Sequence, residues 1–341
     1  MKVLVTGGGG FLGGAIIRRL LDRGDDVRSL SRGTYPELAR LGVAQFHGDI
    51  AHAETVVKAA AGCDLVFHVA AKAGVWGGYE SYYRSNVVGT QNVIDACRRG
   101  GVPRLVFTSS PSVVFDGRDQ EGIDESAPYP ATYVAHYPRT KAAAERLVNR
   151  ADGPDLATVS LRPHLIWGPG DNHLTPRVIE RGRRGRLRLV GRRDHLVDSV
   201  YIDNAADAHL QAADRLAAGS RLGGKNYFIT NDEPVPMSVL LNGILRAAGL
   251  PPVTRRISAA LAFGAGALLE GAYKLLGRRH EPPMTRFVAL QLATAHWFHI
   301  DAAKLDLGYI PKISLDEGFA RLGTWLRRND AEVSRASTAP G

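Results

Sequence analysis

The chain of 341 residues is about twice as long as a typical single domain, so it can bury one large core or two smaller ones. Its 45% hydrophobic and 23% charged residues are close to globular averages, which excludes a disordered, collagen-like or coiled-coil protein. Only Cys63 and Cys97 occur, without the spacing of a metal site or a disulfide framework, so we expect no bound metal and a cytoplasmic location.

The net charge of +9 is concentrated in one segment. The seven arginines of this basic cluster are Arg181, Arg183, Arg184, Arg186, Arg188, Arg192 and Arg193. We interpret the cluster as a solvated basic face, with an acidic substrate, a protein partner and an anionic membrane as the alternatives. No zinc-finger or RNA-binding signature accompanies it, so we expect no nucleic-acid partner.

The N-terminus lacks an apolar leader, and the longest apolar stretch, residues 257–269, is too short to span a bilayer. We therefore expect neither secretion nor a membrane-spanning helix.

In the first half of the chain, short β-branched segments alternate with helical segments. The predicted strands are Lys2–Thr6, Val27–Leu30, Ala44–Phe46, Leu65–Val69, Arg104–Thr108 and Ala157–Leu161. The predicted helices are Phe11–Asp22, Ala53–Ala60, Ser85–Arg99 and Thr140–Asn149. This alternation predicts an α/β protein with a Rossmann-type, doubly wound parallel sheet, whose ligands bind beyond the carboxyl ends of the strands.

After residue 170 the pattern becomes mostly helical, with one more strand pair expected at Asp198–Ile202 and Asn226–Ile229. We predict a dinucleotide-binding domain over 1–170, to which 197–232 returns. A smaller, mostly helical substrate-binding lobe is expected over 171–196 and 233–328, and a flexible tail over 329–341.

The first strand leads directly into Thr6-Gly7-Gly8-Gly9-Gly10-Phe11-Leu12-Gly13 and then into a helix. Gly7 allows the turn, Gly10 lets the backbone approach a pyrophosphate, and Gly13 allows close packing of helix and strand. The helix N-terminus adds partial positive charge. The sequence therefore predicts a nucleotide site that includes Phe11 and Leu12.

The second strand ends in Ser31-Arg32, where an NAD-preferring site has an acidic residue. Arginine suits a 2′-phosphate because it is always charged and donates two parallel hydrogen bonds. We therefore expect NADP(H) as the preferred cofactor, with NAD(H) as an alternative. Asp49 is placed to accept a hydrogen bond from the adenine amine, and we assign Ile50 to the same site.

Tyr137 and Lys141 are four residues apart at the start of a predicted helix and so share one face. We expect the lysine ammonium to lower the pKa of the tyrosine, which can then donate a proton to a developing alkoxide. Ser110 follows the strand at 104–108 and could hold the reacting carbonyl, with Ser112 as the alternative.

These motifs together resemble the extended short-chain dehydrogenase/reductases over about residues 1–330. The matching segments are Thr6-Gly7-x-x-Gly10-Phe11-Leu12-Gly13, Asp49, Asn86-Val87-Val88-Gly89-Thr90, Thr108-Ser109-Ser110, Tyr137-x-x-x-Lys141 and Leu161-Arg162-Pro163. The resemblance implies that Ser110, Tyr137 and Lys141 are catalytic. It also implies that the cofactor is lined by Gly7, Gly10, Gly13, Arg32, Asp49, Ala70 and Pro163, to which we add Ala71 and Lys72, and that Lys141 contacts the nicotinamide ribose.

Particular segments of the chain resemble two subgroups of the extended short-chain dehydrogenase/reductases. Residues 71–77, 110–113 and 165–173 resemble the ketoreductases of bacterial olefin and β-lactone biosynthesis, which reduce 2-alkyl-3-oxoalkanoic acids. Residues 113–117 and 162–164 resemble the 3β-hydroxysteroid and sterol-4α-carboxylate dehydrogenases. The first similarity implies reduction of a long-chain keto acid and the second oxidation of a sterol; a non-catalytic NADP(H)-binding regulator is the third hypothesis.

The substrate side is less defined by the sequence. The apolar segment 257–276 predicts a buried lobe helix, with a lid for an acyl chain or an interfacial helix as alternatives. Lys72 or an arginine of the basic cluster could pair with a substrate carboxylate. Trp76 and Tyr79 could line the cleft or simply pack. We expect a small lipid-like keto acid as substrate, a homodimer, and possible contact with a membrane surface or a multienzyme assembly.

Overall fold

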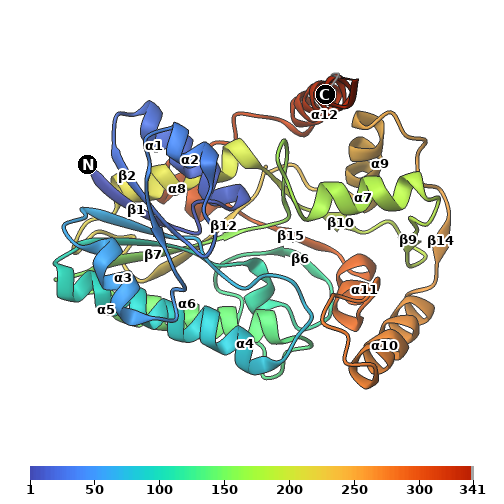
Figure 1. Cartoon of the computed structure of the whole chain (residues 1–341). Helices are drawn as coiled ribbons and strands as arrows, with labels where there is room; N and C mark the ends of the chain where they lie inside the picture. The colour runs from blue at the N-terminus through green and yellow to red at the C-terminus, as the bar shows by residue number, and fades with distance from the viewer. Residues whose placement is uncertain (339–341) are drawn as a thin grey trace.

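Seven parallel strands form the main sheet of this computed structural model, which describes residues 1–338 and the side chains through residue 329. Their order is β12-β7-β5-β4-β1-β2-β3 (Figure 1). The strands are β1 (Lys2–Thr6), β2 (Asp26–Ser31), β3 (Ala44–His47), β4 (Leu65–His68), β5 (Arg104–Thr108), β7 (Ala157–Pro163) and β12 (Lys225–Ile229). The predicted Rossmann-type sheet is confirmed.

Helices cover both faces of this sheet (Figure 1). One face is covered by α1 (Phe11–Asp22) and α8 (Ile202–Arg215), and the other by α3 (Ala53–Ala60), α5 (Gly89–Gly100) and α6 (His136–Ala151). Successive strand residues point to opposite faces. Val3 and Val5 accordingly pack in the core that contains Ile16 of α1, whereas Leu4 packs in the core that contains Val93 of α5.

Most predicted elements of the first half have the expected bounds within a few residues, but one helix differs. The segment predicted as one helix over 85–99 consists of α4 (Tyr79–Tyr83), a π-helical turn η1 (Arg84–Val88) and α5. The helical stretch begins after Gly78, earlier than predicted. The prediction started too late because the first turns carry aromatic and polar residues without a clear apolar period. The remaining elements of this half are α2 (Pro36–Arg40), η2 (Pro111–Val114) and β6 (Gln120–Ile123).

The expected pairing of 198–202 with 226–229 is wrong. Strand β11 (Val200–Tyr201) pairs with β8 (Ile166–Trp167), whereas β12 pairs with β7 in the main sheet. The physical reason is that α8 follows β11 directly and carries the chain across the sheet, so that β12 adds to the sheet edge in parallel, as a crossover helix requires.

A second group of elements lies beside the sheet (Figure 1). These are α7 (Leu174–Arg183), β9 (Leu189–Val190), β10 (Leu196–Val197), β13 (Val235–Pro236), α9 (Met237–Ala247), β14 (Arg256–Ile257), α10 (Ala259–Leu275), α11 (Arg286–Ala293), β15 (His296–Phe298) and η3 (Ala303–Leu307). Strand β6 is the edge of the sheet β13-β10-β15-β6, and β14 pairs with β9. The division into a domain and a lobe stays a prediction. Within residues 1–338, no helix has both the length and the hydropathy of a bilayer span.

The predicted flexible tail coincides in part with the last helix of the structure, and its flexibility stays a prediction. Helix α12 (Leu315–Thr338) continues through the first part of residues 329–341, and 339–341 lie outside the described residues. Residues 329–338 contain no glycine or proline, so no residue there interrupts the backbone hydrogen bonds of the helix.

A buried ion pair fixes α6 against β7. Arg162 donates to both carboxylate oxygens of Glu145, at 3.0 and 2.7 Å, and the two side chains are 1% and 0% exposed. Tyr129 donates a further hydrogen bond to Glu145 at 2.7 Å. Because these charges are removed from water, each depends on the other for its stabilisation.

We predict that Glu145→Ala lowers the free energy of unfolding by about 3–5 kcal/mol, because it leaves the Arg162 guanidinium buried without a counter-ion. Glu180→Ala is the matched control: it removes the exposed Arg184–Glu180 pair, 2.9 Å long, and should cost less than about 1 kcal/mol. Urea unfolding of both variants measures the difference, and equal costs would contradict the interpretation.

Candidate functional site

A cavity of about 570 Å³ lies at the carboxyl ends of the central strands. All of the residues predicted for the site line it. They are Gly7, Gly10, Phe11, Leu12, Gly13, Ser31, Arg32, Asp49, Ile50, Ala70, Ala71, Lys72, Ser110, Tyr137, Lys141 and Pro163. The structure thus brings together residues from the whole first half of the chain, while their chemical roles stay predictions.

The glycine loop between β1 and α1 is closely packed. Gly7 has a φ of +73°, and a Cβ there would lie 2.9 Å from the Ala70 Cα atom. A Cβ on Gly13 would overlap the Gly7 carbonyl. No side chain caps the N-terminus of α1 at Gly10, so the first-turn amides are free to bind an anion. The loop therefore fits the diphosphate of a dinucleotide.

The end of β2 carries polar and basic groups. The Ser31 hydroxyl accepts a hydrogen bond from the Gly9 amide at 3.4 Å, and Arg32 is exposed at the cavity rim without an ion-pair partner among the described residues. Asp49 also lines the cavity, and its carboxylate accepts from the Ala51 amide at 3.0 Å. This region can bind the polar groups of an adenosine.

Tyr35 is a cavity residue that sequence reasoning missed. Its ring lies so close to the loop that a Cβ on Gly9 would overlap it. Gln45 fixes this position, because its amide accepts from the Tyr35 backbone N–H at 2.9 Å and donates to the Tyr35 carbonyl at 3.0 Å. The short turn that places the ring has no sequence pattern of its own.

Tyr137, Ser110 and Lys141 meet at the ends of β5 and α6. Lys141 is 2% exposed, donates to the Thr108 carbonyl at 2.6 Å and lies 4.0 Å from the centre of the Phe107 ring. Ser110 exchanges a hydrogen bond with Ser112 at 2.9 Å. Ser112 does not line the cavity, so the geometry favours Ser110 over the alternative.

The expectation that Lys141 lowers the pKa of Tyr137 is wrong in this structure. Burial raises the pKa of the Tyr137 phenol, and only the neighbouring Ser110 hydroxyl acts in the opposite direction. The Lys141 ammonium donates instead to the Thr108 carbonyl. Burial lowers the pKa of Lys141 itself to about 7, although the Glu145 carboxylate opposes this.

The loop after β4 is tied to α6 by Asn86. Its side chain accepts from the Lys72 amide at 2.7 Å and donates to the Lys72 carbonyl at 3.2 Å and to the Thr140 hydroxyl at 3.0 Å. The Lys72 ammonium turns away to Ser81, at 2.6 Å, and lies 4.7 Å from the centre of the Tyr82 ring. Asn86 thus connects two walls of the cavity.

A second wall comes from residues 165–174, a segment that the sequence marked only by its resemblance and that we did not assign to the site. Leu165 lines the cavity with a φ of +42°, a left-handed conformation that is strained for leucine. Asp171 accepts hydrogen bonds from the amides of His173 and Thr175, both at 2.7 Å, and so orders the turn before α7. Strained non-glycine backbone at a cavity is typical of a functional site.

The sequence of this chain matches a known protein family over three quarters of its length. The model of the 3-beta hydroxysteroid dehydrogenase/isomerase family matches residues 4–258. The chain belongs to this family. It is an NAD(P)-dependent oxidoreductase of the extended short-chain dehydrogenase/reductase type, as the sequence analysis predicted.

Three curated relatives share almost the whole chain. The 2-alkyl-3-oxoalkanoate reductase of Shewanella oneidensis is 53% identical over 93% of this chain and 84% of its own length. The protein of the same name from Stenotrophomonas maltophilia is 52% identical, over 94% and 98% of the two chains. The decarboxylating sterol-4-alpha-carboxylate 3-dehydrogenase of Mus musculus is 34% identical over 94% and 89%.

Two solved structures are similar in fold. MoeE5 in complex with UDP-glucose and NAD has a TM-score of 0.74 and 26% identity, with 96% of this chain and 99% of that chain covered. The structure of gox2253 has a TM-score of 0.76 and 25% identity, over 96% and 98%. Together with the relatives, these structures support a nicotinamide cofactor and a small-molecule substrate for this member of the 3-beta hydroxysteroid dehydrogenase/isomerase family.

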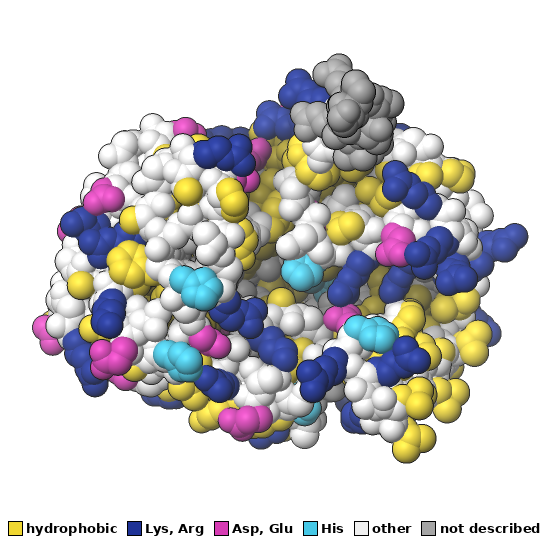
Figure 2. All heavy atoms as spheres, in the orientation of Figure 1, with side chains coloured by type: hydrophobic (Ala, Val, Ile, Leu, Met, Phe, Trp, Pro, Cys, Tyr) yellow, Lys and Arg dark blue, Asp and Glu magenta, His cyan; other side chains and the backbone are white. Residues whose placement is uncertain are grey.

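Most of the residues that we expected to pair with a substrate carboxylate or to line the substrate cleft lie outside the cavity. None of the seven arginines of the basic cluster is among the residues that line the cavity. Figure 2 shows many basic side chains on the surface of the molecule. Arg181, for example, donates to the Pro283 carbonyl. Trp76 donates to the Arg278 carbonyl at 3.0 Å, and the Tyr79 ring packs 5.6 Å from the His136 ring. His296 is buried and bonded to His164 at 2.8 Å, in the core.

The pKa of Lys141 predicts a pH-dependent stability for this enzyme. The unfolded chain keeps a proton on Lys141 up to about 10.5, whereas the folded chain releases it near 7. Between these values the unfolded state binds more protons than the folded state, so the free energy of unfolding should rise with pH from about 7 to about 10.5. Below about pH 7 the free energy of unfolding should be reduced by the full cost of burying the charged lysine.

Lys141→Met should reduce this rise and stabilise the protein near pH 7, whereas the exposed Lys58→Met should leave the rise unchanged. Urea unfolding of the three proteins at a series of pH values measures the effect. An unaltered slope in Lys141→Met would show that the lysine is not the titrating group.

Proposed function

We propose that this chain is an NADPH-dependent ketoreductase that converts the 3-keto group of a long-chain 2-alkyl-3-oxoalkanoic acid to the 3-hydroxy acid. The observation that carries the proposal is the meeting of Tyr137, Ser110 and Lys141 with the glycine loop in one cavity. The substrate class is supported by two relatives that are more than half identical over nearly the whole chain and carry that name.

The proposed chemistry assigns one task to each side chain. A bound nicotinamide supplies the hydride for the ketone carbon. Ser110 donates a hydrogen bond to the ketone oxygen and so holds the carbonyl beside the phenol of Tyr137. Tyr137 gives its proton to this oxygen, which completes the alcohol; its raised pKa keeps the phenol protonated at neutral pH. Lys141 supports this end of α6 through its bond to the Thr108 carbonyl, and in the proposed complex it would also bind the ribose hydroxyls.

The preference for NADPH is supported by the end of β2. Ser31 and the exposed Arg32, which has no ion-pair partner among residues 1–329, follow β2 at the position where an NAD site has an acidic side chain. A guanidinium can bind the 2′-phosphate with two parallel hydrogen bonds, and a carboxylate there would repel it. Tyr35 and the glycine loop form the adjoining surface.

A second candidate function is the oxidation of a 3β-hydroxyl on a sterol carboxylate. The family match and the 34% identical sterol-4-alpha-carboxylate dehydrogenase favour it. The two functions use the same three side chains in opposite directions. Assays of a 2-alkyl-3-oxoalkanoate with NADPH and of a 3β-hydroxysterol carboxylate with NADP⁺ separate them, and activity only in the second assay would overturn the first proposal.

Tyr137→Phe should reduce kcat by at least ~10²-fold, because the general acid is lost, while NADPH affinity stays almost unchanged. The matched control is Tyr133→Phe, which removes a hydroxyl that only donates to the Val113 carbonyl at 3.1 Å, outside the cavity. It should keep near-normal activity. Steady-state reduction and NADPH titration of both variants test this, and a fully active Tyr137→Phe enzyme would refute the assignment.

Arg32→Ala should weaken NADPH binding by about 10- to 100-fold, the scale of a lost charged hydrogen bond, and barely affect NADH. Arg40→Ala, a change of another exposed arginine on the connection between β2 and β3, should affect neither cofactor. Dissociation constants from fluorescence titration with each cofactor measure the selectivity. Equal losses for NADPH and NADH would remove the argument from the 2′-phosphate.

A further inference from the structure

We propose that the ammonium of Lys72 binds the carboxylate of the substrate and so selects acids over neutral ketones. Lys72 follows β4 and lines the cavity. In both candidate substrates, the 2-alkyl-3-oxo acid and the sterol-4α-carboxylate, the carboxylate stands on the carbon next to the reacting carbon. A group that binds it must therefore lie beside Ser110 and Tyr137. The inference rests on the proposed function, because it assigns a side chain to the substrate named there.

The lysine and arginine side chains that line the cavity differ in their positions along the sheet. They are Arg32, Lys72 and Lys141. Arg32 follows β2, which is separated from β5 by β1 and β4. Lys141 is buried and donates to the Thr108 carbonyl. Lys72 follows β4, the neighbour of β5, after which Ser110 stands. Lys72 is therefore the cation of this set that is placed for the substrate.

Hydrogen bonds fix the backbone of Lys72 relative to the backbone of Tyr137. The Asn86 amide, 2% exposed, accepts from the Lys72 N–H at 2.7 Å and donates to the Lys72 carbonyl at 3.2 Å. The same amide donates to the Thr140 hydroxyl at 3.0 Å, and this hydroxyl donates to the Tyr137 carbonyl at 3.0 Å. Two buried side chains thus connect the proposed carboxylate-binding residue to the proposed proton donor.

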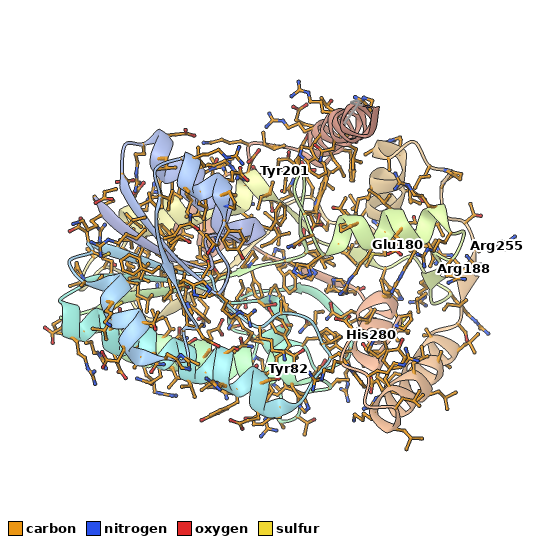
Figure 3. All side chains as sticks on the ribbon, viewed as in Figure 1. Tyr82, Glu180, Arg188, Tyr201, Arg255 and His280 are labelled. Carbon is orange, nitrogen blue, oxygen red and sulfur yellow. The ribbon has the colours of Figure 1, made fainter. Side chains whose placement is uncertain are left out.

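The ammonium lies at the catalytic end of the cavity, on the side of the lobe. Its nitrogen is 4.7 Å from the centre of the Tyr82 ring, and Figure 3 shows Tyr82 on α4, at the end of the helical layer that faces the lobe. Burial raises the pKa of Tyr82 to about 12, and the Glu281 carboxylate and the Tyr137 phenol add to this shift. Tyr137 is therefore close to the ring on which the ammonium of Lys72 rests.

The positive charge of Lys72 has no ion-pair partner among residues 1–329. Its ammonium donates to the neutral hydroxyl of Ser81 at 2.6 Å, and this hydroxyl donates to the Gly78 carbonyl at 2.7 Å. The carboxylate of Glu281 accepts instead from Arg177, at 3.1 and 3.3 Å. A carboxylate forms a stronger hydrogen bond with an ammonium than a hydroxyl does. The flexible stem of lysine allows the ammonium to move from Ser81 to such a ligand.

The acidic residues that line the cavity do not oppose a substrate carboxylate at this end. They are Asp49 and Asp171. Asp49 follows β3, at the far edge of the sheet from β5. Both oxygens of Asp171 accept from backbone amides, those of His173 and Thr175. A negative charge that arrives beside Lys72 therefore meets an unpaired cation and no free acid.

His173 is another cavity residue that can carry a positive charge. It is exposed in the turn before α7, and its ring makes no hydrogen bond within residues 1–329. Lysine, unlike histidine, keeps a full charge at neutral pH. The charge therefore favours Lys72, and a variant of His173 serves as the competing arm of the test.

The test compares kcat/KM for a 2-alkyl-3-oxo acid with kcat/KM for its methyl ester, both measured with NADPH. Lys72→Met keeps the length of the side chain without its charge. It should lower the ratio of acid to ester by about 10- to 100-fold, the scale of a lost charged hydrogen bond. Lys72→Arg keeps the charge and should retain most of the ratio. The rate with the ester reports whether each variant is folded.

Matched controls separate substrate binding from other roles of Lys72. Ser81→Ala removes the partner of the ammonium outside the cavity, and Lys58→Met removes an exposed lysine elsewhere. Both should keep the ratio of acid to ester. A loss in Ser81→Ala as large as in Lys72→Met would show that the pair only stabilises α4, and would overturn the proposal.

Two further results would also overturn it. One is a loss of NADPH affinity in Lys72→Met as large as the loss with the acid, which would assign the ammonium to the cofactor diphosphate. The other is a ratio that falls in His173→Gln but not in Lys72→Met. Fluorescence titration with NADPH and the same pair of substrates measure these outcomes.

A binding measurement keeps this result separate from the proposed function. The probes are 2-butyloctanoic acid and its methyl ester, which lack a ketone, titrated by calorimetry in the presence of NADP⁺. Lys72→Met should weaken binding of the acid by at least ~10-fold and of the ester far less. If Lys72 binds the acid but neither candidate substrate is converted, only the proposed function fails. A wild-type chain that does not prefer the acid to the ester overturns the role of Lys72, whatever reaction it catalyses.

Discussion

The site depends on how α6 is held against the sheet by buried charges. Lys141 reaches from the helix to the Thr108 carbonyl at the end of β5, and one turn later Glu145 pairs with Arg162 of β7. A helix anchored at both strands has little freedom to shift or rotate. Tyr137, one turn before Lys141, is therefore fixed beside Ser110 by interactions that lie behind the cavity, not within it. The cost of this arrangement is a buried ammonium, which lowers the pKa of Lys141 to about 7.

Other parts of the cavity are also held in position by residues whose hydrogen bonds lie outside it. Asn86 bonds the loop after β4 and also Thr140 of α6, so two walls share one amide. Gln45 fixes the Tyr35 backbone, which in turn places a ring on the glycine loop. These residues need not touch a ligand to determine its position. Hydrogen bonds formed before binding reduce the ordering that a ligand would otherwise have to cause.

The sheet and most of the cavity residues could be predicted from the sequence because the patterns that mark them are local. The glycine loop, Tyr137 with Lys141, and Ser110 each follow or begin an element that periodicity marks clearly. Tyr35 and Leu165 were missed because their positions depend on contacts with segments far away in the chain. The predictions of the β11 partner and of the Tyr137 pKa were wrong for the same reason. The pairing of β11 with β8 depends on a crossover helix, and the pKa of Tyr137 depends on burial, so both are set by neighbours in three dimensions.

Helix α10 shows where local and global signals disagree. An apolar segment of this length predicts burial, yet the separate core beside it contains only Val190, Ala262 and Ala289. Amphipathic helices obtain most of their stability from packing one face, and α10 packs little of its surface within the chain. Leucines that remain exposed on a charged protein lower its solubility unless another surface covers them. The exposed leucines of α10 are therefore a feature of the folded lobe that the apolar pattern of the sequence does not predict, because burial depends on which segments pack beside the helix.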